Sequence, residues 1–233
     1  MSLGGPPREN TASTFAALAL ELHDAPGLEE TVDAVVQFAL QALNCTYAGV
    51  AFSARGARPE VAAVTAPVVA GIYELQISSK DGPLVTAMRE QVPVLIRDTT
   101  TDGRWPVWAA KVAALGVRSV LDVPLATGPE ARRAVGVLGL YSPDPDAFGP
   151  DDEAVAHILA RHASVALASA RQEAALAQAV DARKLVGQAM GILMERFDID
   201  ADRAFAVLRR YSQDTNTKLR DVAQQLIDTR KLP

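Results

Sequence analysis

A stretch of 29 residues between positions 154 and 182 contains 12 alanines and neither glycine nor proline. Alanine has the highest helix propensity of the common residues, whereas glycine and proline are the residues that most often interrupt helices. The acidic triplet at 151–153 precedes this stretch, and negative side chains in a first turn interact favourably with the helix dipole. The sequence therefore predicts one uninterrupted helix that joins the part of the chain before it to the part after it.

An alanine-rich helix of this length is hard to stabilise in water without a partner. Ile158, Val165 and Gln172 recur at a spacing of seven residues, and Leu159 and Ala166 follow the same repeat. Such a repeat is typical of a coiled-coil seam. We therefore expect a parallel homodimer along this helix, although a rigid spacer would have the same composition.

The region before this helix alternates short apolar runs with helical patterns. Hairpins and crossover helices around one central antiparallel sheet predict an α+β fold with helices flanking the sheet. The expected strands are 48–52, 60–64, 92–96, 117–124 and 134–141, and the expected helices are 11–23, 32–43, 68–75, 84–90 and 105–115.

Residues 176–232, which begin within the last turns of the long helix, have the pattern of three amphipathic helices. This pattern predicts a small all-α module. N-cap signals at 198–200 and 215–217 separate the helices. Residues 1–180 carry 13 basic and 20 acidic side chains, a net charge of −7, whereas residues 181–233 carry 10 and 8, a net charge of +2. A nucleic-acid partner is therefore electrostatically plausible only for the tail.

The tail resembles the ANTAR domain, the RNA-binding module of transcription antitermination regulators. The resemblance covers the whole module and is carried by Gln188-Ala189, Gly191-Ile192-Leu193-Met194, Asp202, Ala204-Phe205, Leu208, Ser212-Gln213 and Lys218-Leu219-Arg220-Asp221-Val222-Ala223. It implies binding to paired hairpins in nascent messenger RNA leaders, which prevents a terminator stem from forming.

The third tail helix carries Lys218 and Arg220 in its first turn, the end where positive charge is unfavourable by roughly 0.3–1 kcal/mol for each cation. The free N–H groups of a helix start and two cations would together bind a phosphate, and the resemblance places this block in the family's motif. Solvated surface cations would explain the same residues. The candidate RNA-binding residues are Arg183, Lys184, Tyr211, Ser212, Gln213, Asn216, Lys218 and Arg220.

Tyr211 offers one ring on which an unpaired base could stack, and Ser212, Gln213 and Asn216 offer hydrogen-bonding groups beside the cations. A core tyrosine followed by a polar turn explains these residues equally well. Met190 stands where many members of the family have lysine, so a contact made by that lysine would be lost here or replaced by Arg183 or Lys184.

Gly187 and Gly191 lie four residues apart within the first tail helix, where each costs about 1 kcal/mol relative to alanine. Spacing of four places both on one face of the helix. We expect the second tail helix to pack closely against this face through Phe205 and Leu208, in preference to direct contact with RNA.

Residues 25–168 resemble a GAF domain, through Asp81-Gly82-Pro83-Leu84, Val94-Leu95-Ile96-Arg97-Asp98, Arg104-Trp105-Pro106, residues 115–121, Pro124-Leu125, residues 136–140 and Ala147-Phe148. The resemblance implies a sensor that uses a cavity between the sheet and the helices near 68–75 and 84–89, for an unidentified small-molecule ligand. The polar candidates near these segments are Tyr73, Asp98, Trp105 and Ser119, although Asp98 and Trp105 also suit a structural role. We thus divide the chain into a tail and short helix (1–24), a GAF sensor (25–168), and a connector with the ANTAR domain (169–233).

The residues that catalysis or metal binding would need are not grouped in the sequence. His157 and His162 lie about 140° apart around a helix, His23 is isolated, and no phosphate-binding loop motif is present. Cys45, the single cysteine, suits a small buried hydrophobe better than a tether for a bilin. We therefore expect no enzyme activity, no metal and no cofactor. The chain also lacks a run of about 18 apolar residues and a signal-peptide pattern at its start, so we expect a cytoplasmic protein and no membrane contact.

The sequence thus predicts a sensor-controlled, homodimeric RNA-binding antitermination regulator. One alternative is a DNA-binding regulator that uses the last two helices as a helix-turn-helix, although Asp221 and Asp228 on the recognition helix would repel duplex DNA. Another is a sensor whose tail only dimerises or docks a protein.

Overall fold

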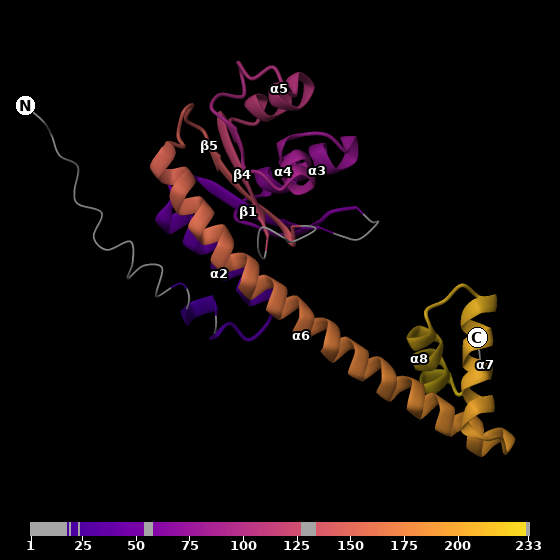
Figure 1. Ribbon diagram of the computed structural model, residues 1–233. Coiled ribbons are helices and arrows are strands. Elements are labelled where there is room, and N and C mark those ends of the chain that lie inside the picture. The colour runs from indigo at the N-terminus through magenta and orange to yellow at the C-terminus, as the bar shows by residue number, and fades with distance from the viewer. Residues whose placement is uncertain (1–17, 19, 23, 54–57, 127–133, 232–233) are drawn as a thin grey trace, which may run out of the picture. The chain divides into compact units, whose positions relative to one another are not determined.

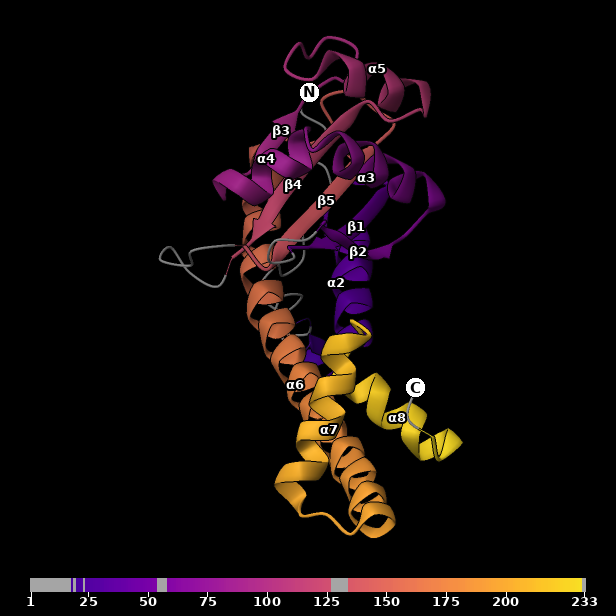
Figure 2. The ribbon, with the colours of Figure 1, turned by 90° about the vertical axis from the view of Figure 1, so that its right-hand side faces the viewer.

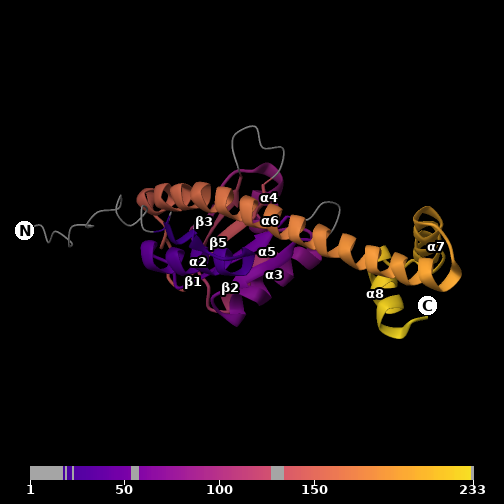
Figure 3. The ribbon, with the colours of Figure 1, turned by 90° about the horizontal axis from the view of Figure 1, so that it is seen from below.

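The computed structural model describes residues 18, 20–22, 24–53, 58–126 and 134–231, and the chain divides into two compact units, Met1–Arg171 and Gln172–Pro233. Most of the helix expected at 11–23 lies outside the described residues, and Leu18 and residues 20–22 are helical. Helix α6 (Pro150–Phe197) is one unbroken helix of 48 residues, which Figure 3 follows along its whole length. The predicted continuous helix is therefore confirmed.

The first unit is built around a five-stranded antiparallel sheet in the order β2-β1-β5-β4-β3 (Figure 2). The strands are β1 (Tyr47–Phe52), β2 (Glu60–Val64), β3 (Val94–Ile96), β4 (Ser119–Leu125) and β5 (Gly136–Ser142). Strand β5 is buried along its whole length and β1 and β4 along nearly all of theirs, because helices cover both faces of the sheet. For this reason the central strands read in the sequence as continuous apolar runs instead of alternating patterns.

Helices form one layer on each face of the sheet (Figure 1). Helix α2 (Leu28–Ala42) and the first part of α6 share one core cluster with β1, β4 and β5. Helices α3 (Pro67–Ser79), α4 (Pro83–Glu90) and α5 (Pro106–Ala114) share the other cluster with the opposite face. The predicted α+β class is confirmed, and α3 runs four residues beyond its expected end at Leu75 because Gln76 and Ile77 are also buried in the core.

The coiled-coil repeat expected on α6 needs one correction. Leu159 is fully buried in the core of the first unit, so it cannot belong to a seam between two copies. Ile158 and Val165, in contrast, are 43% and 63% exposed. The face of α6 that carries Leu159 packs against the sheet, whereas the face that carries Ile158 and Val165 remains exposed.

The second unit contains the last part of α6 and the helices α7 (Ala201–Asp214) and α8 (Leu219–Thr229). Its core is one cluster of buried residues, Ala189, Leu193, Ala204, Leu208, Val222, Ala223 and Leu226. The predicted three-helix module is confirmed. Helix α8 runs in the same direction as α6, because Arg220 lies near Gln178 and Leu185 whereas Ile227 lies near Ile192.

The two expected caps behave differently. The Asp200 side chain caps α7 by accepting a 2.8 Å hydrogen bond from the Arg203 amide, as the sequence predicts. The cap expected within 215–217 is wrong, since the N-cap residue of α8 is Lys218 and no side chain caps this helix. The Thr217 hydroxyl instead donates a hydrogen bond to the Thr215 carbonyl, and the Thr217 carbonyl accepts one from the Ser212 hydroxyl. The polar groups of Thr217 therefore stabilise the α7–α8 turn and do not cap α8.

Candidate functional site

Three polar side chains meet inside the first unit, between the sheet and helix α3. Tyr73, Asp122 and Tyr141 are all fully buried, and their terminal oxygens have no hydrogen-bond partner among the described residues. A Cβ atom built on Gly139 would lie 2.5 Å from the Tyr141 Oη, 2.8 Å from the Asp122 Oδ1 and 2.8 Å from the Tyr73 Oη. Glycine at 139 therefore leaves the space in which these three oxygens converge.

Burial raises the pKa of the Asp122 carboxyl to about 8. A buried carboxyl without a cation beside it favours its neutral form. The tyrosine rings of Tyr73 and Tyr141 meet edge to face, with centroids 6.1 Å apart. The cluster is therefore a neutral polar site in an apolar core, which is a costly arrangement to keep buried.

Of the four residues expected to line a ligand cavity, Tyr73 alone belongs to this cluster. Asp98 accepts two hydrogen bonds from the Arg118 guanidinium, which holds the pKa of the Asp98 carboxyl well below its usual range. The Trp105 indole donates to Asp81, and the buried Ser119 hydroxyl donates to the Asp144 carbonyl. These three residues have partners elsewhere: Asp98 and Ser119 join loops to the start of β4, and Trp105 joins the α3–α4 loop to the start of α5.

Sequence reasoning missed Asp122 and Tyr141. A signal for Asp122 was present, because an aspartate in the middle of the apolar run 117–124 is unusual for a buried strand. Nothing comparable marked Tyr141, since a tyrosine near the end of a strand is ordinary. Cys45 is half-buried, its thiol donates to the Ala39 carbonyl, and burial raises its pKa to about 12, in keeping with the small hydrophobe expected.

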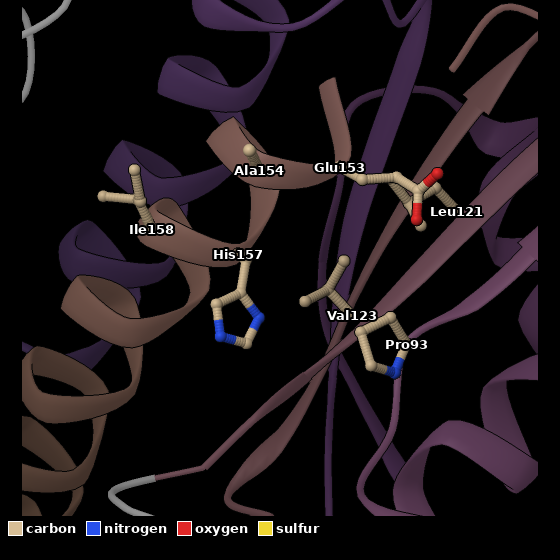
Figure 4. A pocket seen from close by; sticks show the side chains of 7 residues that line it. All are labelled: Pro93, Leu121, Val123, Glu153, Ala154, His157 and Ile158. Carbon is tan, nitrogen blue, oxygen red and sulfur yellow. The ribbon is translucent and has the colours of Figure 1, made fainter. Parts of the chain in front are cut away.

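A shallow groove of about 500 Å³ lies between α6 and the β3–β4 side of the sheet. Figure 4 shows Glu153 projecting from α6 toward Leu121 and His157 projecting to the side of Val123 and Pro93. Ile158 lines the same groove and is partly exposed. The groove thus continues the open face of α6 described above.

In the second unit, the candidate RNA-binding residues lie at the turn between α7 and α8 and on the adjoining part of α6. Gln213, Asn216 and Lys218 are exposed, whereas Tyr211 and Ser212 are half-buried. The Ser212 hydroxyl donates to the Thr217 carbonyl at 2.6 Å, and Tyr211 packs against the tail core. The turn therefore uses Ser212 for its own geometry, and Tyr211 presents only part of its ring.

Arg220 differs in its surroundings from Lys218. Its guanidinium lies 3.1 Å from the Asp221 carboxylate, and both line a groove of about 280 Å³ together with Asp181, Gln178 and Gln224. Two carboxylates beside one guanidinium make this groove negative overall, which weakens its attraction for a phosphate. Arg183 and Lys184 are exposed on α6 beside this groove but do not line it.

The expectation for the two tail glycines is wrong. Gly187 and Gly191 are exposed, and a Cβ atom on either would meet no described atom within 4 Å. Helix α7 packs against the opposite side of α6, through Leu208 and Leu193, and Phe205 remains 39% exposed. Met190 is half-buried against this core, as an apolar side chain should be.

No group of three or more histidine, cysteine, aspartate or glutamate side chains that could hold a metal ion occurs within the described ranges. The helices that the structure describes are too short or too polar to cross a membrane.

The sheet with a polar cluster in its core, joined by one long helix to a three-helix module, defines a two-domain architecture. The family model for the GAF domain matches residues 27–167, and the model for the ANTAR domain matches residues 174–227. The chain belongs to the GAF family, and with the ANTAR domain after it, it has the organisation of a GAF–ANTAR regulator. Both resemblances noted in the sequence are thereby confirmed.

Solved structures resemble the first unit in fold. The GAF domain of a phosphoenolpyruvate-protein phosphotransferase from Coxiella burnetii is 17% identical with a TM-score of 0.55, and its match covers 70% of this chain and 95% of that one. The GAF domain of the phosphoenolpyruvate-protein phosphotransferase from Acinetobacter is 16% identical with a TM-score of 0.54 and the same coverage. A domain of a putative two-component sensor histidine kinase from Sinorhizobium meliloti 1021 is 20% identical with a TM-score of 0.51, covering 64% and 96%. None of the curated proteins matches this chain.

Proposed function

We propose that this protein is a transcription antitermination regulator whose ANTAR domain binds two-hairpin motifs in nascent messenger RNA leaders, under the control of its GAF domain. The match of residues 174–227 to the ANTAR family carries this proposal. The surplus of positive charge in residues 181–233, in a chain that is negative overall, supports it. We place the protein in the cytoplasm, where nascent transcripts are, and assign it no enzyme activity.

The candidate contact surface consists of Lys218 and Arg220 with Arg183, Lys184, Tyr211, Ser212, Gln213 and Asn216. Exposed cations position a nucleic-acid backbone, while polar side chains at a turn reach the edges of unpaired bases. Duplex DNA is disfavoured because Asp221 and Asp228 are exposed on α8, the helix that would enter the major groove. A surface that repels duplex DNA through these carboxylates and attracts a hairpin loop through its cations is suited to binding unpaired bases.

The experiment that tests this function compares binding to an RNA with two adjacent stem-loops and to duplex DNA of the same length. Fluorescence anisotropy at low ionic strength measures both affinities. We expect the RNA to bind at least tenfold more tightly. Equal affinity, or preference for the duplex, would favour the DNA-binding alternative, and no binding to either would favour a tail that only docks a protein.

The double substitution Lys218→Ala with Arg220→Ala is expected to weaken RNA binding at least tenfold and to reduce the slope of log K against log salt by about 1.5, as the loss of two phosphate contacts would. The melting temperature should change little, because both side chains are exposed and neither caps a helix. Arg209→Ala with Arg210→Ala removes the same charge from α7 and serves as the matched control. Equal losses in both variants would mean that charge alone matters and that the turn is not the site.

We also propose that two copies pair along α6. Ile158 and Val165 in the first unit and Leu176 and Val180 in the second are exposed apolar side chains of this helix. A helix that presents such residues to water gains stability when another copy covers them. A dimer would offer two ANTAR domains to two hairpins, which raises affinity through effective concentration.

Control by the GAF domain, through an unidentified ligand, would pass along α6 because the helix has no break between the units. Three residues inserted between Ala174 and Ala177 turn the following helix by about 300°, whereas seven residues return it to within about 20° of its original phase. In a terminator-readthrough reporter, we expect the three-residue insertion to change readthrough severalfold and the seven-residue insertion to leave it close to wild type. Identical readthrough in both variants would contradict coupling through the helix.

A further inference from the structure

A groove of about 630 Å³ runs between α6 and the C-terminal half of α8, at the end of the second unit away from the α7–α8 turn. Ile192 and Ile227 are the apolar side chains that line it, and Gln188 is a polar residue of the same lining. Gly191 forms part of this lining without a side chain, and Arg196 and Arg230 lie at one end. None of these residues was among the RNA-binding candidates from the sequence.

The glycine at 191 has no explanation in the packing of the protein. Glycine is among the least favourable residues in a helix interior, and a Cβ at this position would meet no described atom within 4 Å. A side chain here would extend into the groove that Gly191 lines. The missing side chain therefore keeps open a space that the described part of the chain does not fill.

The charge of this groove is opposite to that of the groove beside Arg220. Two arginines, Arg196 and Arg230, line it together with one acidic residue, Glu195, and neither arginine forms an ion pair with a described residue. The Arg196 guanidinium lies 5.6 Å from the centroid of the Phe197 ring. Arg196 also donates a 2.6 Å hydrogen bond to the Arg230 carbonyl, which fixes it at the end of α8. The side-chain charge at this end of α8 is therefore more favourable for a phosphate than the side-chain charge of the negative groove at its start.

We infer that this groove binds an unpaired nucleobase of the hairpin RNA together with the adjoining phosphate; this rests on the proposed function. The base lies between the apolar walls of Ile192 and Ile227 with its face over Gly191. The Gln188 carboxamide, which both donates and accepts hydrogen bonds, contacts the edge of the base. The two guanidiniums bind the phosphate, for which the planar fork of arginine is well suited. The RNA then follows α8 from the turn at Lys218 to Arg230.

The test is a leucine substitution at Gly191, with the same substitution at Gly187 as the matched control. Both glycines are exposed on α6 and open to a side chain, but Gly187 does not line the groove. Both variants should therefore melt at or above the wild-type temperature. The binding probe is a pool of RNAs with two adjacent stem-loops and randomised loops. We expect Gly191→Leu to weaken binding at least tenfold and Gly187→Leu to change it less than twofold.

A second variant, Arg230→Ala, tests the phosphate contact. It should lower the slope of log K against log salt by about 0.7–0.9, the value for one lost contact. Its side chain is exposed and forms no ion pair with a described residue, so the fold should persist. An unchanged slope would contradict the phosphate contact.

Three results would overturn the inference. If wild type binds the pool and both leucine variants bind as well as it does, the groove is not the base site although the proposed function stands. If Gly191→Leu retains RNA binding but changes the oligomeric state, the groove is a protein interface. If wild type binds no member of the pool, the proposed function fails and this inference fails with it.

Discussion

Replacing Asp122 with asparagine is expected to make the free energy of unfolding less dependent on pH. In wild type, the Asp122 carboxyl is expected to lower the free energy of unfolding by about 1.4 kcal/mol for each pH unit between pH 5 and pH 7.5, and Asp122→Asn should abolish this decrease. The folded protein holds a proton on this carboxyl up to a pKa of about 8, whereas the unfolded chain releases it near the ordinary aspartate pKa of 3.8. Between these two values the folded state binds one more proton than the unfolded state. Stability contributed by the neutral carboxyl is therefore complete at low pH and is lost as the pH rises toward 8.

Chemical denaturation of wild type and Asp122→Asn at several values of pH measures this slope. Asparagine keeps the shape and the polarity of the side chain but has no proton to lose, so the variant should gain stability relative to wild type as the pH rises. Asp144→Asn removes an exposed carboxylate from the same unit and controls for the change in net charge. A slope in Asp122→Asn equal to that of wild type would mean that the buried carboxyl is ionised in the folded state.

Substituting both Leu176 and Val180 with glutamate is expected to convert a dimer into a monomer and to weaken binding to two-hairpin RNA by roughly 10²-fold or more. These side chains are 60% and 64% exposed on α6, one helical turn apart. Two pairs of like charges in a helix–helix seam would repel each other. Affinity for a single hairpin should stay within about twofold, because the ANTAR domain itself is unchanged.

Light scattering measures the mass of the variant, and fluorescence anisotropy measures its affinity for RNAs with one and with two hairpins. Ala206→Glu with Gln225→Glu adds the same charge at exposed positions of α7 and α8 and controls for repulsion between protein and RNA. If wild type is monomeric, or if the Leu176 and Val180 variant remains dimeric, pairing along this face of α6 is wrong. Equal losses on both RNAs would indicate that the added charge, and not the loss of the dimer, weakens binding.

The elements of secondary structure could be predicted because local chemistry decides them. Alanines without glycine or proline gave the continuous α6, and an aspartate at position 200 gave the start of α7. The apolar runs predicted all five strands to within a few residues, since each central strand is covered on both faces. The sequence motifs also identified both domains, which the family models confirm.

The composition of the sites could not be predicted, because it depends on which faces of these elements meet. Tyr73, Asp122 and Tyr141 come from α3, β4 and β5 and converge only when Gly139 on β5 lies beneath them. The cap expected within 215–217 is wrong because the contacts of Thr217 with Ser212 and Thr215 form only after the turn has closed.

The sequence by itself determined that this protein has a sheet domain, a long helix and a three-helix module, because helix propensity and apolar periodicity act over a few neighbouring residues. Only the tertiary structure decided that Leu159 is buried while Ile158 is exposed, and that Gly191 opens a positive groove instead of receiving a second helix. The reason is geometric: residues that share a helix differ by the direction in which they point, and the packing of the other elements decides which direction is filled.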